Sequence, residues 1–223
     1  SQINPHFLYN TLESITWMVE AHKNTDAVFM ISELAKLLRI SLSKGRTIIK
    51  ISDEIQHSRS YMNIQKVRYK ERFKTEFIID EEVNDYCIVK LVVQPILENA
   101  IYYGVGNMDE DDGGKITVHG EKKDDDIYIT VEDNGMGMSE EVVDNILSDN
   151  EKVPKHGSGV GLINVHNRIQ LMFGSQYGLQ VYSEPDEGTR IVIHIPAIPY
   201  NEQNRVELEK QKYGKAKVTD EEK

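Results

Sequence analysis

Asp133-Asn134-Gly135-Met136-Gly137 and Gly157-Ser158-Gly159-Val160-Gly161 are two glycine-bearing segments that follow an apolar stretch containing Glu98-Asn99-Ala100. Asp133 ends a stretch of alternating polarity, which predicts a strand. Its carboxylate could accept a hydrogen bond from the 6-amino group of adenine, and the two glycines of its segment would let the backbone approach the purine. Asp-Asn-Gly is also a frequent turn sequence, so this segment alone leaves both interpretations open.

Composition limits the possible classes of protein. The chain has 223 residues, 39% of them hydrophobic and 28% charged, which suits one large or two modest soluble domains. A net charge of -11 argues against a nucleic-acid partner, because such surfaces are basic. The single Cys87 excludes an internal disulfide and fits a reducing cytosol. No run approaches the roughly 18 apolar residues of a membrane span. We expect the chain, which begins at Ser1 without methionine, to be a soluble piece of a longer protein.

Residues 5–69 predict helices, with an interruption at 44–46. A second helix is expected from Thr25, and a third from Ser52 to Val67 with acidic residues in its first turn. The first helix carries an apolar stripe with helical spacing, formed by Leu8, Leu12, Ile15 and Val19.

After Arg72 the pattern indicates a second kind of structure. Helices are expected at 87–103 and 161–173, and a long polar loop at 134–158. Strands are expected at 73–79, 115–119, 127–131, 179–182 and 189–195. The prediction is an α+β fold, in which a helical module at 1–70 precedes an α/β sandwich at 71–199 with a mixed, mostly antiparallel sheet covered by helices on one face. The charged tail at 200–223 has few apolar anchors, and we expect it to be disordered.

Glu98 and Asn99 are adjacent polar residues in an otherwise apolar helix, where burial without partners is unfavourable. Mg²⁺ takes hard oxygen ligands and keeps several waters, so the Asn99 amide oxygen with phosphate oxygens would suffice to hold it. Glu98 could orient or deprotonate an attacking group. A pair capped by local hydrogen bonds at a helix end is the alternative.

The glycines at 157, 159 and 161 precede a predicted helix. Glycine there frees backbone N–H groups to face phosphates, and the helix N-terminus adds partial positive charge. The spacing matches neither the dinucleotide-binding fingerprint nor the glycine-lysine phosphate loop. A plain hinge is the alternative for this segment alone.

Taken together, the three segments resemble the N box and the two glycine boxes of the GHKL ATPase superfamily, which includes DNA gyrase and the histidine kinases. The resemblance covers about 73–196 and includes Gly188-Thr189 before the last strand. It implies that Asn99 binds Mg²⁺, that Asp133 binds the adenine of ATP and that Thr189 supports the base. It further implies that Gly157, Gly159 and Gly161 close over the phosphates, beside a variable lid at 138–156.

His6 lies nearly opposite the apolar stripe of its helix, so we expect it to face outward with Asn10, Glu13 and Trp17. Near pH 7 an exposed imidazole is substantially neutral and nucleophilic. A surface histidine without a role is the more frequent case. However, Gln2-Ile3-Asn4-Pro5-His6-Phe7-Leu8-Tyr9-Asn10-Thr11-Leu12 closely resembles the H box of LytS/YesM-type sensor histidine kinases, with further similarity at Tyr61, Ile64-Gln65 and Arg68.

This second resemblance implies that ATP phosphorylates His6 and that the phosphoryl group passes to an aspartate of a response regulator. It also implies a homodimer built on a four-helix bundle, and a membrane-bound sensor upstream, which would make the chain the cytoplasmic part of a bacterial plasma-membrane protein. Many other histidine kinases carry an acid directly after the histidine. Here that residue is Phe7, so Glu98 is the first candidate for the proton acceptor and Glu13 the second.

Two other functions stay open. The chain could be a GHKL ATPase or serine kinase that hydrolyses or transfers phosphate without using His6, and acid-stable label would favour a serine kinase. It could also be a nucleotide-binding pseudokinase that acts as a dimeric scaffold, in which case ATP would bind without transfer.

Overall fold

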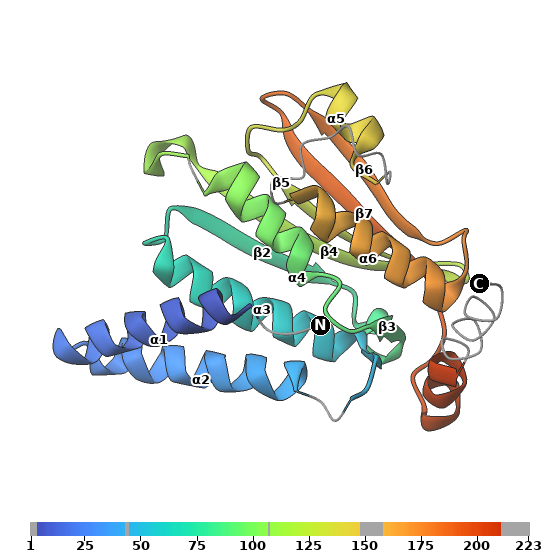
Figure 1. Cartoon of the computed structure of the whole chain (residues 1–223), viewed down its shortest axis with the longest axis horizontal. Helices are drawn as coiled ribbons and strands as arrows, with labels where there is room; N and C mark the ends of the chain where they lie inside the picture. The colour runs from blue at the N-terminus through green and yellow to red at the C-terminus, as the bar shows by residue number, and fades with distance from the viewer. Residues whose placement is uncertain (1–3, 43–44, 107, 148–157, 211–223) are drawn as a thin grey trace, which may run out of the picture.

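The computed structural model describes residues 4–210 except 43–44, 107 and 148–157. In it, a helical module lies beside an α/β domain (Figure 1). The α-helices are α1 (Pro5–Glu20), α2 (Asn24–Ser41), α3 (Ile51–Arg68), α4 (Gln94–Asn99), α5 (Glu140–Asn145) and α6 (Ser158–Phe173). The strands are β1 (Ile48–Lys50), β2 (Phe73–Ile79), β3 (Cys87–Val89), β4 (Gly114–Lys123), β5 (Asp126–Asp133), β6 (Gly178–Glu184) and β7 (Gly188–Pro196). Shorter helical turns are η1 (Glu81–Asp85), η2 (Ala100–Val105) and η3 (Glu110–Asp112).

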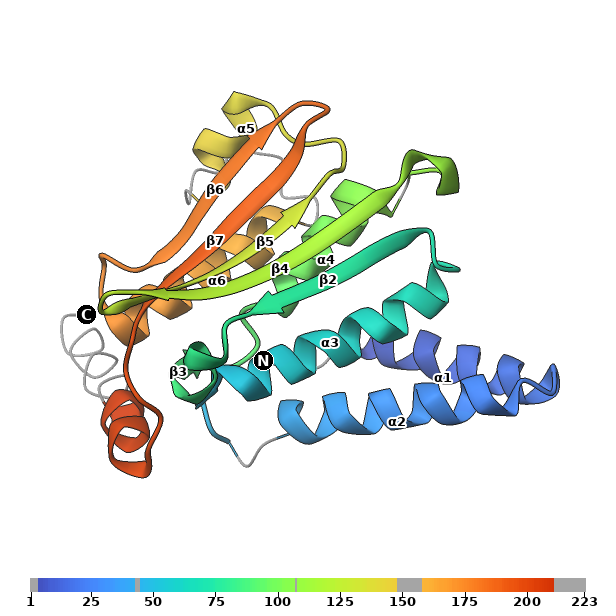
Figure 2. The same cartoon turned by 180° about the vertical axis from the view of Figure 1, so that it is seen from behind.

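The main sheet has five strands in the order β2-β4-β5-β7-β6. Strands β2 and β4 run parallel, and the other neighbours are antiparallel. Helices α4 and α6 cover one face, and the view from behind shows that no helix of the described residues covers the other face (Figure 2). The α+β class, with a mixed and mostly antiparallel sheet covered on one side, is therefore confirmed.

Helix α1 packs on α2 and α3 with a face that differs from the expected stripe. Among the expected residues, Leu12 is 46% and Val19 is 52% exposed, while Ile15 is buried. The inward face is Phe7, Thr11, Ile15 and Met18. The helix is apolar on more than one side, so the periodicity alone could not decide which side the rest of the chain would cover.

The expected helix at 87–103 is wrong in its first part. Cys87–Val89 forms strand β3, which pairs antiparallel with β1, a strand that was not expected between the predicted second and third helices. The β-branched Ile88 and Val89 suit a strand, and the helix begins only at Gln94, with Pro95 in its first turn where the missing N–H is tolerated. Beyond α4 the helix continues as the π-type turn η2.

The expected loop at 134–158 contains a short helix, α5, and its residues 148–157 lie outside the described part of the chain. Acidic residues in the first turn of α5 suit its N-terminus. None of the helices in the described part of the chain is long and apolar enough to cross a membrane.

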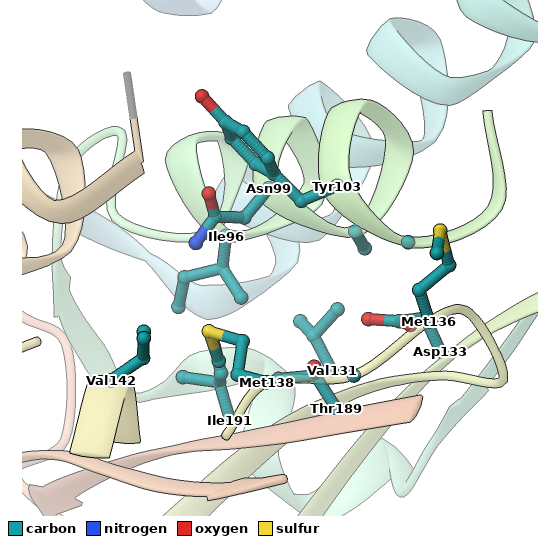
Figure 3. Close-up of a pocket in the computed structure, with 13 residues that line it drawn as sticks. Ile96, Asn99, Tyr103, Val131, Asp133, Met136, Met138, Val142, Thr189 and Ile191 are labelled. Carbon is teal, nitrogen blue, oxygen red and sulfur yellow. The ribbon is translucent and has the colours of Figure 1, made fainter. Parts of the chain in front are cut away.

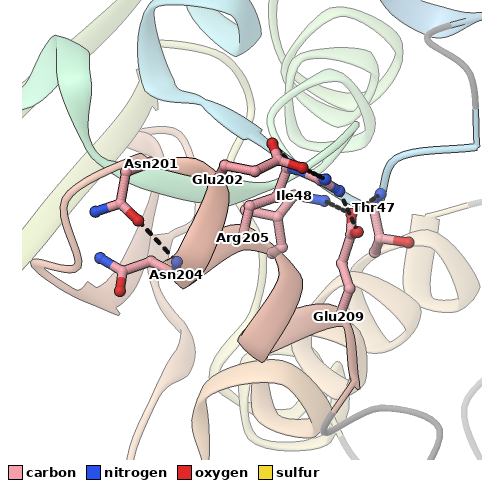
Figure 4. Close-up of polar contacts among 7 residues, drawn as sticks. All are labelled: Thr47, Ile48, Asn201, Glu202, Asn204, Arg205 and Glu209. Atoms are coloured by element: carbon pink, nitrogen blue, oxygen red, sulfur yellow. Dashed lines mark hydrogen bonds and ion pairs between the residues drawn. The ribbon is translucent and has the colours of Figure 1, made fainter.

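The expectation of a disordered tail is wrong for residues 202–210, which form a helix. Figure 4 shows that the Glu209 carboxylate accepts backbone N–H bonds from Thr47 at 2.7 Å and Ile48 at 3.1 Å. Arg205 pairs with Glu209 at 2.6 Å, and Leu208 is buried. A few specific contacts hold this helix, and composition does not reveal them. Residues 211–223 lie outside the described part of the chain.

Candidate nucleotide site

A cavity of about 340 Å³ lies between α4–η2 and the ends of β5 and β7 (Figure 3). Most of its wall is aliphatic or thioether, and four of its side chains carry polar groups. These four are Asn99, Tyr103, Asp133 and Thr189, and the apolar ones include Ile96, Val131, Met136, Met138, Val142 and Ile191. A mostly apolar cavity with a few fixed polar groups is typical of a site for a small organic ligand.

Asp133 belongs to the inward-facing series of β5. Ile127, Ile129 and Val131 point to the buried side at every second position, and Asp133 continues that alternation with only 6% of its surface exposed. In the ladder it stands opposite Thr189 of β7. The pairing register of β5 and β7 therefore places a carboxylate and a hydroxyl residue side by side at the cavity.

Burial raises the pKa of the Asp133 carboxyl to about 6, and the backbone N–H groups of Gly135 and Thr189 oppose that shift. Gly135 donates its N–H to Oδ1 at 2.9 Å. The group is thus largely ionised at pH 7, although most of its hydration has been removed. A buried carboxylate with unused acceptor capacity is suited to accept a hydrogen bond from a ligand.

The glycines of the first segment have a packing role that the sequence analysis did not anticipate. A Cβ on Gly135 would lie 2.3 Å from the Gly104 Cα atom, so the loop after β5 approaches η2 backbone to backbone. Gly137 has a φ of 64°, and a Cβ there would lie 1.9 Å from the carbonyl oxygen of Glu184. Both positions exclude larger residues because of protein neighbours.

Ser183 of β6 organises this edge of the site. Its hydroxyl donates to the Gly188 carbonyl oxygen at 2.7 Å, accepts the Met138 N–H at 2.8 Å and lies 2.9 Å from the Thr189 hydroxyl. Ser183 is also the register partner of Thr189. Sequence reasoning missed Ser183, since its relation to Thr189 exists only once β6 and β7 are paired.

Asn99 lies on the face of α4–η2 that lines the cavity. It shares that face with Ile96, Ala100 and Tyr103, at the three- and four-residue spacings of one helix side. Gly104, which also lines the cavity, was missed; a Cβ there would lie 2.6 Å from Asp133 Oδ1. The only feature of the sequence that could have indicated Gly104 is a glycine near the end of an apolar helix.

Glu98 points elsewhere and does not line the cavity. Its Oε1 accepts a hydrogen bond from Gln94 Nε2 at 2.8 Å, as the local-capping alternative expected. Burial raises the pKa of the Glu98 carboxyl, and its charge helps raise the pKa of Tyr61 on α3. Glu98 therefore lies on the side of α4 that meets the helical module.

A metal ion at this cavity would have few protein ligands. Among the described residues, no group of three or more His, Cys, Asp or Glu side chains could hold an ion. Asn99 supplies an amide oxygen at the cavity wall, which fits a Mg²⁺ ion that keeps waters and ligand oxygens in its shell.

His6 lies at the exposed start of α1, outside the residues that line the cavity. The Asn4 side chain accepts its backbone N–H at 3.0 Å and caps the helix. Asn10 Nδ2 lies 3.2 Å from Nδ1 and 3.3 Å from Nε2 of the ring. Glu13 and Trp17 are exposed on the same helix, so the outward orientation expected for this group agrees with the structure.

The second glycine segment is only partly within the described residues. Gly157 lies outside them, while Gly159 and Gly161 belong to α6, near its N-terminus. Among the described residues, a Cβ on Gly161 would meet nothing nearer than Pro95 Cβ at 3.9 Å, so no crowding there requires glycine.

Comparison with known proteins finds two family matches along the chain. Residues 1–73 match the family model described as histidine kinase, and residues 84–199 match histidine kinase-, DNA gyrase B-, and HSP90-like ATPase. Solved structures support the fold of the second part: the mycobacterial sensor histidine kinase MprB has a TM-score of 0.50 at 15% identity, covering 70% of this chain and 99% of that one. The catalytic domain of histidine kinase ThkA has a TM-score of 0.51 at 18% identity, covering 69% and 98%.

Among curated proteins, sensor histidine kinase YesM of Bacillus subtilis is 42% identical over 196 residues, which is 88% of this chain and 32% of YesM. BtsS of Escherichia coli is 29% identical over 196 residues, again 88% of this chain and 32% of the relative. The chain thus spans about a third of the length of these relatives. With a histidine kinase module followed by a gyrase- and HSP90-like ATPase domain, the chain belongs to the sensor histidine kinases.

Proposed function

We propose that the chain binds ATP with Mg²⁺, transfers the γ-phosphoryl group to His6 and passes it on to an aspartate of a response regulator. The observation that carries the nucleotide part is the buried Asp133 carboxylate in a cavity with apolar walls. The exposed His6 on a capped helix, within the matched histidine kinase module, supports the acceptor.

Asp133 would select the base. Its ionised carboxylate accepts the 6-amino group of adenine, whereas guanine presents an oxygen there that the carboxylate would repel. A buried site built on such a bond discriminates by roughly 10⁴. Thr189, held by Ser183, would support the same edge of the base, and the flanking methionine and isoleucine side chains would cover its faces.

Asn99 would hold Mg²⁺ together with phosphate oxygens and water. When bound, the ion would neutralise charge on the phosphates. The segment of Gly157, Gly159 and Gly161 would contact the phosphates through backbone N–H groups at the start of α6, where the helix dipole favours negative charge.

In the transfer step, a ring nitrogen of His6 attacks the γ-phosphorus in line. The N–P bond forms, the bond from the γ-phosphorus to its bridging oxygen breaks, and ADP leaves with that electron pair. The imidazole then gives up a proton. Glu98 suits this role because its carboxyl has a raised pKa and lies towards Tyr61, on which Phe7 packs with ring centroids 5.2 Å apart. Glu13, exposed on α1, is the second candidate.

The helical module supports a homodimer as the working form. Large apolar side chains stay exposed on both of its outer helices, and Trp17 is 57% exposed. Pairing these faces with a second copy would complete a four-helix bundle and leave His6 accessible to the response regulator. By its similarity to the sensor histidine kinase YesM, we further propose that the chain works on the cytoplasmic side of a bacterial plasma membrane together with a membrane-bound sensor.

Label chemistry tests the reaction class. The purified chain is incubated with γ-labelled ATP and Mg²⁺, and the labelled protein is then treated with acid and with base. We expect acid-labile, base-stable label that a receiver domain of a response regulator removes. Acid-stable label would instead indicate a serine kinase. ATP binding without any label would indicate a nucleotide-binding scaffold that does not transfer the phosphoryl group.

A further inference from the structure

A second cavity, of about 370 Å³, lies where the helical module meets the ATPase domain. Ser41, Arg46 and Thr47 contribute from the α2–β1 side, and Lys90 and Arg168 contribute from the loop before α4 and from α6. Its wall thus combines three cationic side chains with hydroxyl residues, in a chain whose net charge is -11. This cavity is separate from the one that contains Asp133.

We call this second cavity the junction cavity. Two of its cationic side chains, Lys90 and Arg168, lie close to each other and are partly buried. Burial lowers the pKa of the Arg168 guanidinium, and burial and the charge of Arg168 both lower the pKa of the Lys90 ammonium. Arg168 donates to the carbonyl oxygens of Leu91, at 3.1 Å, and of Lys90. Lys90 Nζ donates to the Ser41 carbonyl oxygen at 3.2 Å. Backbone carbonyls therefore position these two side chains, while the charge of Glu54 acts on both of them and that of Glu209 acts on Lys90.

The nearby carboxylates are already engaged by backbone groups. Glu54 accepts the N–H groups of Leu91, Val92 and Val93 at 2.8 to 2.9 Å. Glu209 accepts two N–H groups of the α2–β1 connection. Within the described residues, neither Arg46 nor Arg168 forms an ion pair with a carboxylate. Glu54 and Glu209 offset part of the repulsion between Lys90 and Arg168, and an anion in the cavity would offset more of it.

We propose that this junction cavity binds a small phosphate-bearing anion. Guanidinium groups offer forked N–H donors that match the oxygens of a phosphate, and charge-assisted bonds of this type are about twice as strong as neutral ones. A cavity of this size on an acidic protein suits a small ligand better than a polyanion. The phosphate group could come from free inorganic phosphate or from a phosphorylated small molecule.

Such an anion would join two parts of the chain. Arg46 and Thr47 lie on the connection between α2 and β1, inside the histidine-bearing module, whereas Lys90 and Arg168 hold the loop before the helix of Asn99. Occupancy of the cavity would therefore tighten the contact between the two. The proposal does not rest on ATP binding or on phosphorylation of His6.

The test is a titration of the ¹⁵N-labelled chain with inorganic phosphate, and separately with glycerol 3-phosphate, at constant ionic strength. Amide signals of Gly45, Thr47 and Lys90 should shift and saturate, whereas those of Gly135 and Gly188 report phosphate that enters the nucleotide cavity instead. Tighter binding of inorganic phosphate identifies the free ion as the source, and tighter binding of the ester identifies a phosphorylated small molecule. Acetate serves as the carboxylate control.

Arg46→Glu should weaken the affinity at least about tenfold, since it reverses one charge at the cavity. Arg46 is exposed, so the fold should tolerate the change, which an unchanged amide spectrum elsewhere would verify. Arg72→Glu, an exposed arginine between α3 and β2, is the charge-matched control and should bind as the native chain does. The proposal is overturned if neither phosphate compound gives saturable shifts, if Arg46→Glu binds with native affinity, or if acetate binds as tightly.

Discussion

Without a ligand, the buried Asp133 carboxylate lowers the free energy of unfolding of the chain at neutral pH. Its carboxyl has a pKa of about 6 in the folded chain against an ordinary value of 3.8. Between these values the unfolded chain binds fewer protons, so this group lowers the free energy of unfolding as pH rises from about 4 to about 6. Above that range the penalty is complete and constant.

Asp133→Asn should therefore stabilise the nucleotide-free chain at pH 7 by about 1–3 kcal/mol, while abolishing ATP binding. Urea unfolding at pH 5 and pH 7 measures the first effect, and the gain should be larger at pH 7. Glu132→Gln, at the exposed neighbouring position, is the matched control and should change little. A less stable Asp133→Asn chain, or one that still binds ATP, would contradict the role given to this carboxylate.

The glycines of the two segments should respond differently to alanine. Gly135→Ala inserts a methyl group into backbone contact with Gly104 and should lower the free energy of unfolding by about 1–3 kcal/mol. Gly161→Ala places its methyl group in ordinary contact with Pro95 within the described residues and should be neutral or stabilising by up to about 1 kcal/mol. Urea unfolding measures the free energy of unfolding of both variants. Equal losses in that free energy would show that crowding at Gly135 does not cause its destabilisation.

At the scale of elements, α3 is tied to the helix of Asn99 by one side chain. Glu54 is fully buried and accepts three consecutive N–H groups just before α4. Glu54→Ala would leave these donors without a partner and a void beside them, so we expect a loss of about 3 kcal/mol or more. Asp53→Ala, exposed in the same turn, should cost far less. Similar unfolding midpoints in denaturant for the two variants would argue against this link.

The spacing of hydrophobic residues along the sequence predicted the helices and strands that have one exposed and one buried face. β2 has the predicted bounds, Phe73–Ile79, because its alternation is regular. The pattern failed at Cys87–Val89, where a short, wholly buried apolar run reads equally well as strand or helix. It also failed for residues 202–210, whose position depends on Glu209 reaching a connection far away in the sequence.

The sequence predicted those site residues whose side-chain chemistry can be recognised without knowing the fold. Asp133, Asn99 and Thr189 meet at one cavity, as the order of the motifs suggested. Ser183 and Gly104 could not be found, because their roles come from strand register and from close backbone approach. Glu98 is adjacent to Asn99 in sequence, but the helical rotation of 100° turns it towards α3.

At the scale of the whole molecule, the exposed apolar faces of α1 and α2 predict self-association. Ile31→Glu should convert a dimer of the 25.6 kDa chain into a monomer, because it places a charge within the exposed apolar face. Ser32→Glu, on the neighbouring exposed position, is the control and should remain dimeric. Light scattering coupled to size exclusion reads out the mass. A native chain that stays monomeric at all concentrations would contradict the expectation.

The central claim is that His6 receives the phosphoryl group from ATP bound at the cavity of Asp133. The most direct measurement compares label from γ-labelled ATP in the native chain, in His6→Ala and in His22→Ala, which changes another exposed histidine at the end of α1. We predict acid-labile label in the native chain and in His22→Ala, and none in His6→Ala, with ATP affinity equal in all three. Label that persists in His6→Ala would contradict the account.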